Sequence, residues 1–106
     1  MWARVMTFYS DDEDMTDLMA SMRSQLQEAY EPIPGFRGAL VMQQQGARTH
    51  VIALTLWDDE ETLQATKATA DGFADRIADA IGTSVARNVY DVLGSLGLPG
   101  EAPSPD

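Results

Sequence analysis

Two kinds of hydrophobic pattern alternate along the chain. Short runs rich in aromatic and β-branched residues are typical of strands, whereas apolar residues at three- and four-residue steps are typical of amphipathic helices. The runs predict strands over about 2–9, 35–45, 48–57 and 83–94, and the stepped pattern predicts helices over about 12–30 and 59–81. The order of the elements is therefore strand, helix, strand, strand, helix, strand.

Capping residues mark the ends of both predicted helices. Ser10 with Glu13, and Asp58 with Glu61, each form a capping box in which a side chain satisfies a free backbone N–H. The prolines of the segment EPIPG end the first helix, and Gly82 ends the second. The clustered acids are thus interpreted as helix starts, where the helix dipole favours negative charge, and not as metal ligands.

The order β-α-β-β-α-β predicts an α+β, ferredoxin-like fold with a four-stranded antiparallel sheet and both helices on one face. One face of such a sheet is left bare. In the third strand Val51, Ala53 and Thr55 alternate with Ile52 and Leu54, so neither face of this strand is polar. An apolar bare face needs a cover. A second copy of the chain is the simplest cover, and we expect a homodimer.

Composition limits the partners. The 106 residues fit one domain over 1–93, followed by a flexible tail rich in Pro and Gly over 94–106. Seven basic against 17 acidic residues leave a charge of −10, which disfavours nucleic acid. The chain has no cysteine, and therefore no disulfide or thiolate chemistry. With no signal-peptide pattern or membrane-spanning stretch, we expect a cytoplasmic protein with no membrane partner.

Four segments carry a resemblance to a known family. They are ARVMTF in the first strand, PGFRGALVM leading through the second, LTLWDDEETLQA at the junction of the third strand and second helix, and VYDVL in the fourth strand. Together they make residues 2–93 similar to the antibiotic-biosynthesis-monooxygenase (ABM) superfamily of dimeric α+β barrels. The resemblance implies a ligand cavity between the helices and the sheet. Its members include cofactor-independent oxygenases, quinol monooxygenases and haem-degrading enzymes.

The resemblance also suggests a substrate-binding site. Trp57 matches a tryptophan that lines the cavity in the family, although it could equally be a core residue at the start of a helix. Phe73 would form a second wall, and Thr7, Tyr9 or Asn88 would orient a substrate hydroxyl. No catalytic residue is assigned, and neither a cofactor nor a metal ion is expected.

Departures from the family narrow the functions. The haem-ligating histidine of haem-degrading members would fall near Lys67, and the second helix contains no histidine, which disfavours haem degradation. The asparagine of the polyketide-oxidising branch is replaced by Ala53. His50, the single histidine, lies at the far end of its strand from Trp57 and is interpreted as a surface residue.

Three hypotheses follow for the function. The first is a cofactor-independent monooxygenase that uses dioxygen on a small aromatic compound such as a quinol, naphthol or anthrone. The second is a ligand-binding dimer without catalysis, and the third is a structural dimer whose own side chains fill the cavity.

A separate question concerns Arg4, Arg37 and Arg87 in the predicted strands. They either bind an anionic ligand or, as we favour, pair with Asp91 and with acids across the dimer.

Overall fold

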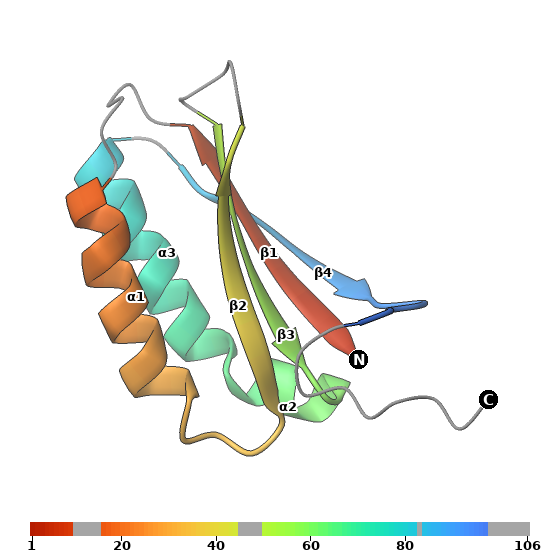
Figure 1. Cartoon of the computed structure of the whole chain (residues 1–106). Helices are drawn as coiled ribbons and strands as arrows, with labels where there is room; N and C mark the ends of the chain where they lie inside the picture. The colour runs from red at the N-terminus through yellow and green to blue at the C-terminus, as the bar shows by residue number, and fades with distance from the viewer. Residues whose placement is uncertain (10–15, 45–49, 83, 98–106) are drawn as a thin grey trace.

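The computed structural model describes residues 1–9, 16–44, 50–82 and 84–97. It has the predicted α+β order, with the second helix divided in two (Figure 1). The elements are β1 (Trp2–Tyr9), α1 (Thr16–Tyr30), β2 (Phe36–Gln43), β3 (His50–Trp57), α2 (Glu60–Ala65), α3 (Lys67–Ile81) and β4 (Ala86–Asp91).

The four strands form one antiparallel sheet in the order β2-β3-β1-β4, the ferredoxin-like arrangement that the element order predicts. The two central strands, β1 and β3, pair along their whole length, from Trp2 opposite Trp57 to Tyr9 opposite His50. The helices α1 and α3 run side by side along one face of the sheet, and α2 lies near the end of β3 (Figure 1).

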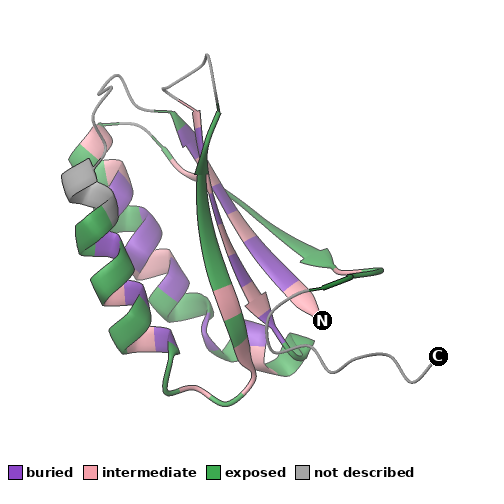
Figure 2. Ribbon diagram, in the orientation of Figure 1, coloured by how far each residue is buried: buried purple, intermediate pink, exposed green. Residues whose placement is uncertain are grey.

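The register assigns every strand residue to one of two faces, which we call the inner face, toward the helices, and the outer face. Arg4 lies opposite Thr55 and Met6 lies opposite Ala53, and all four side chains are buried on the inner face. Figure 2 shows that burial is concentrated between the helices and the central strands, whereas the edge strands β2 and β4 are exposed along most of their length.

The second helix differs from its prediction at two points. It is interrupted at Thr66, where the backbone turns to φ −95° and ψ 6°, so that α2 and α3 replace one continuous helix. Its N-cap is Asp59, one residue after the predicted Asp58. The Asp59 carboxylate accepts the Thr62 N–H at 2.7 Å, and this bond lowers the pKa of Asp59. Asp58 instead forms an exposed ion pair with Arg37.

The ends of the other elements agree with their signals where the structure describes them. Gly82 ends α3 in the left-handed region at φ 76°, where its N–H donates to the Ala78 carbonyl at 2.8 Å. The capping box at residues 10–13 and the turn at 45–49 lie outside the described residues, as does most of the tail. Within the described ranges no helix is both long enough and apolar enough to cross a membrane.

Candidate functional site

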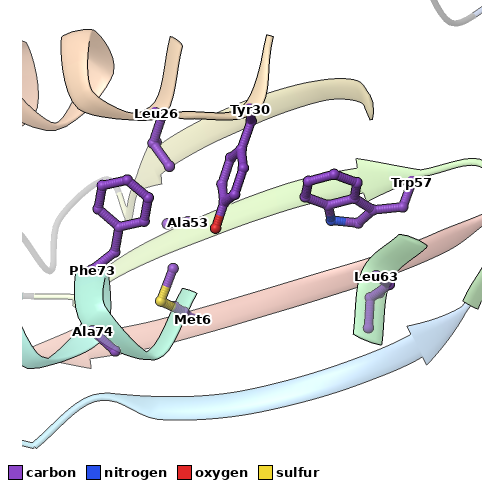
Figure 3. Close-up of a cluster of buried hydrophobic side chains, with 8 residues drawn as sticks. All are labelled: Met6, Leu26, Tyr30, Ala53, Trp57, Leu63, Phe73 and Ala74. Carbon is purple, nitrogen blue, oxygen red and sulfur yellow. The ribbon is translucent and has the colours of Figure 1, made fainter. Parts of the chain in front are cut away.

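An aromatic cluster fills the space between the helices and the sheet (Figure 3). Tyr30, the last residue of α1, is at its centre, edge-on to Trp57 at 5.0 Å and to Phe73 at 5.6 Å between ring centroids. Phe36, at the start of β2, packs against Trp57 at 5.3 Å. Both Tyr30 and Trp57 are 0% exposed, so these rings form a closed core.

Trp57 has no free polar atom in this cluster. Its indole N–H donates to the Thr55 hydroxyl at 3.0 Å, on the same face of the same strand. Phe73 is also buried, and the Arg76 guanidinium lies 4.7 Å from the centre of its ring, in the geometry of a cation–π contact. The structure therefore brings Trp57 and Phe73 into one cluster, as the sequence suggests, with the ring of Tyr30 packed against both.

Tyr30 is the functional candidate that the sequence does not single out, because its position extends the apolar stripe of the first helix. Its hydroxyl points toward the sheet (Figure 3), and it is buried without a hydrogen-bond partner among the described residues. Burial raises the pKa of Tyr30, and the positive charge of Arg4 opposes part of that rise. A buried phenol without a partner is unusual, because desolvating a hydroxyl is costly.

Arg4 supplies the charge next to this phenol. Its side chain extends from β1 under the interruption between α2 and α3, and only 6% of the residue is exposed. Nη2 donates to the Leu63 carbonyl at 2.6 Å and Nη1 donates to the Thr66 hydroxyl at 3.1 Å. Burial lowers the pKa of Arg4. The guanidinium thus stabilises the end of α2, where unpaired carbonyls favour a cation.

The strand arginines divide into two kinds. Arg37 pairs with Asp58, and Arg87 pairs with Asp71 at 2.7 Å and with Asp75 at 3.3 Å. Arg37 and Arg87 follow the favoured pairing, with Asp58, Asp71 and Asp75 of the same chain, while pairing across a dimer stays a prediction. Arg4 does not follow the favoured pairing, because within the described ranges it forms no ion pair with a carboxylate.

Among the described residues, three clefts lie beside the aromatic cluster or beside side chains that contact it. The first has a volume of about 490 Å³ and separates α1 from β2. The second, of about 270 Å³, separates β1 and β4 from α2 and α3, and the third, of about 400 Å³, lies between α1 and α3. Leu26 and Phe36 line the first, Arg4 and Met6 the second, and Phe73 the third, while Trp57 lines none of them.

The remaining predicted site residues belong to the outer face. Thr7 lies opposite Ile52, and Tyr9, 60% exposed, stacks on His50 at 4.7 Å. Asn88 pairs with Val5 of that face, although it also borders the 270 Å³ cleft. The structure thus separates Thr7 and Tyr9 from Trp57 and Phe73. Ligand binding by Thr7, Tyr9 or Asn88 stays a prediction. For Thr7 and Tyr9, such a ligand would bind on the outer face, across the sheet from Trp57.

Metal ligation has no support in the part of the chain that the structure describes. Within residues 1–9, 16–44, 50–82 and 84–97, no three His, Cys, Asp or Glu side chains gather in a group that could hold a metal ion.

No protein-family model matches the chain, and no curated protein does either. Solved structures do. A Streptomyces coelicolor monooxygenase from the gene ActVA-Orf6, in complex with the ligand nanaomycin D, is 16% identical over 97% of this chain and 92% of its own, with a TM-score of 0.70. The cofactor-independent oxygenase SnoaB from Streptomyces nogalater, crystallised as a point mutant, is 13% identical over 90% and 95%, with a TM-score of 0.66.

A further match extends the fold beyond named oxygenases. A Bacillus halodurans protein of the ethyl tert-butyl ether D family is 17% identical over 88% of this chain and all of its own, with a TM-score of 0.59. The chain therefore has the fold of the antibiotic biosynthesis monooxygenase structures over nearly its whole length. At these identities the similarity shows the fold, and the chemistry has to be argued from this chain's own residues.

Proposed function

We propose that this protein is a cofactor-independent monooxygenase for a small aromatic compound of the quinol, naphthol or anthrone type. The observation that carries the proposal is the Tyr30 hydroxyl, buried without a partner between Trp57 and Phe73. An unsatisfied donor surrounded by rings suits the oxygen atom of an aromatic substrate. The shared fold with structures of cofactor-independent oxygenases supports the same class of reaction.

The reaction needs little from the protein beyond binding, orientation and exclusion of water. A naphthol first loses its proton, and the electron-rich anion passes one electron to dioxygen. The resulting radical pair forms a carbon–oxygen bond, and the peroxide anion takes back the proton that the naphthol released. Loss of water, which includes the hydrogen of that carbon, leaves a quinone carbonyl. One oxygen atom ends in the product and the other in water. Tyr30 would donate to the substrate oxygen, and the ring walls would keep water out.

Substrate binding would require a change in the aromatic cluster, because its rings are in contact. We place the entry at the cleft of about 400 Å³ between α1 and α3, which Phe73 and Arg76 line. Rotation of the Phe73 or Tyr30 side chain would connect this cleft with the cluster. Trp57 would then be a wall of the site, with its N–H still held by Thr55.

A specific observation favours a second candidate function. The packing of Tyr30 and Phe36 against Trp57, together with the internal bond of the indole N–H, is what a filled and non-catalytic cavity requires. In that case the protein is a ligand-binding or structural dimer of the same fold.

Both candidate functions would leave the outer face free to contact a second copy of the chain. We infer that a second copy covers this face, since Leu40, Met42 and Tyr90 on it are about half exposed.

Dioxygen uptake tests the oxygenase proposal. The purified protein is assayed with naphthols, anthrones and quinols, and we expect saturable uptake that falls about tenfold or more in Tyr30→Phe, since a buried donor to the developing charge is lost. We also expect a reduction in Trp57→Phe, which alters a wall. Tyr90→Phe is the matched control, because it removes the same hydroxyl from an exposed position on the outer face.

The outcomes separate the candidates. Uptake that is equal in wild type and Tyr30→Phe would remove Tyr30 from the reaction. If no compound of the panel causes uptake while calorimetry detects binding, the ligand-binding function replaces the enzyme. The absence of both uptake and binding would leave the structural dimer.

A further inference from the structure

Positive charge is concentrated at one place on this acidic protein. The chain carries 17 acidic residues and only seven basic ones, yet Arg4, Lys67 and Arg87 line a single cleft of about 270 Å³. One carboxylate, that of Asp71, shares the lining. Asp71 accepts from Lys67 at 2.8 Å and from Arg87 at 2.7 Å, and Arg87 also pairs with Asp75. The two cations at the rim are thus neutralised within the chain.

Arg4 is different, because its charge is buried and forms no ion pair with a carboxylate in the described part of the chain, although the Asp71 carboxylate of the same cleft lies close enough to favour its charged form. A guanidinium carries five N–H donors, and the structure gives Arg4 two hydrogen bonds, to a carbonyl and to a hydroxyl. Neither acceptor is charged. A buried cation is costly unless an anion compensates it, and a guanidinium matches a carboxylate in geometry. This cleft therefore has an unbalanced charge at its inner end.

A second observation concerns the core side of the cleft. Met6 lines the cleft and is also a member of the aromatic cluster, so one side chain separates the two spaces. Behind it lies the Tyr30 hydroxyl, which is completely buried and makes no hydrogen bond to a described residue. The walls next to Arg4 are apolar, formed by Met6, Ala70 and Val89. An aromatic ring fits such walls, and an acidic group fits the end of the cleft.

We propose that this cleft binds the carboxylate of a small aromatic acid, with Arg4 as its anchor and the ring against Met6, Ala70 and Val89. Arg87 and Lys67 lie at the mouth, where Asp71 and Asp75 neutralise their charges, so the attraction for an anion comes from Arg4. The inference rests on the proposed function in one respect, because both assume that a small aromatic compound binds between the helices and the sheet. The binding itself requires no oxidation.

The test compares two probes of nearly equal shape by calorimetry. The first is 2-naphthoate, and the second is 2-naphthamide, in which a neutral amide replaces the carboxylate. We expect wild type to bind 2-naphthoate about tenfold or more tightly than 2-naphthamide, because a charge-assisted hydrogen bond is lost with the amide. Equal affinities for the two probes, or no binding of 2-naphthoate, would overturn the proposal.

The variants locate the site. Arg4→Gln keeps a polar side chain at this position but removes the positive charge, and we expect 2-naphthoate to bind about tenfold to a hundredfold more weakly. Arg37→Gln is the matched control, since it removes a strand arginine outside this cleft, and its affinity should equal that of wild type. Unchanged affinity in a folded Arg4→Gln would exclude Arg4 as the anchor.

A second measurement does not depend on the folding of Arg4→Gln. Amide chemical shifts of the wild type, followed during a titration with 2-naphthoate, should change most at Lys67, Ala70 and Val89. Changes centred on Arg23 and Gln27 would assign the probe to the cleft of about 490 Å³ and overturn the proposal. If the protein binds 2-naphthoate but takes up no oxygen with any naphthol, anthrone or quinol, the oxygenase is contradicted and the anion site stays intact, so the two proposals fail separately.

Discussion

The inner and outer faces of the sheet consist of alternating residues of the same strands, yet they have opposite environments. On the inner face, Trp57 is fully buried and Arg4 is 6% exposed, whereas on the outer face Leu40 is 54% exposed. The face that buries a charged residue is thus the covered one, and the face rich in aliphatic side chains is open to solvent. In the part of the chain that the structure describes, both clusters of buried hydrophobic residues draw their strand residues from the inner face.

This difference shows what each face contributes. The helices remove the inner face from water, so a tryptophan, a tyrosine and an arginine there can be held by packing and hydrogen bonds within one chain. On the outer face the apolar side chains gain little until another surface covers them. The inner face therefore holds the core and the candidate site, whereas association through the outer face stays a prediction.

The largest effect should come from removing a ring of the inner face. Trp57→Ala deletes a side chain in contact with Tyr30 and Phe36, and we expect a loss of about 3–5 kcal/mol in the free energy of unfolding. Leu40→Ala on the outer face should cost less than about 1 kcal/mol in dilute protein, because Leu40 is half exposed. Urea denaturation measures both, and similar losses would contradict the contrast between the faces.

A second experiment concerns association. Leu40 and Val41 are neighbours on β2 with similar exposure, but Leu40 lies opposite Leu54 on the outer face and Val41 lies opposite Ala53 on the inner face. We expect Leu40→Glu to weaken the homodimer about tenfold or more, since it buries a charge between two copies. Val41→Glu should leave the dimer unchanged. Analytical ultracentrifugation over a range of concentrations measures both, and a wild-type monomer would disprove the assignment of the outer face.

The smallest effect is the titration of Tyr30. Burial raises the pKa of Tyr30 above its usual value of 10.0, so the folded state holds this proton more tightly than the unfolded state. The contribution to stability is complete below pH 10.0 and is lost as the pH rises through the folded pKa. Tyr30→Phe should remove this alkaline loss, whereas Tyr90→Phe should keep it. Urea midpoints between pH 8 and pH 11 measure the difference, and equal slopes in the two variants would contradict it.

The elements themselves could be predicted because their signals are local. The strand alternation of residues 51–56, the helix stop at Gly82 and the order of elements all hold in the structure, and they suffice for the ferredoxin-like sheet. The helix interruption at Thr66 could not be predicted in this way. Its partner is Arg4, 62 residues earlier in the sequence, and no local propensity encodes a contact of that kind.

The candidate site could be predicted only in part, for the same reason. Trp57 and Phe73 were expected as walls, and they do lie in one cluster, but the ring between them, Tyr30, looks like any other apolar position of its helix. Thr7 and Tyr9 were expected near these walls and lie across the sheet from them. Alternation separates odd from even positions of a strand, but it does not say which set meets the helices.

The sequence by itself therefore determined the α+β order, the antiparallel pairing and the presence of two apolar faces, because periodicity and capping are properties of neighbouring residues. Only the tertiary structure decided which face is covered. That choice follows from how the helices pack across the sheet, and it places Tyr30 beside Trp57 and buries Arg4 under the junction of α2 and α3. Both proposals depend on these long-range contacts.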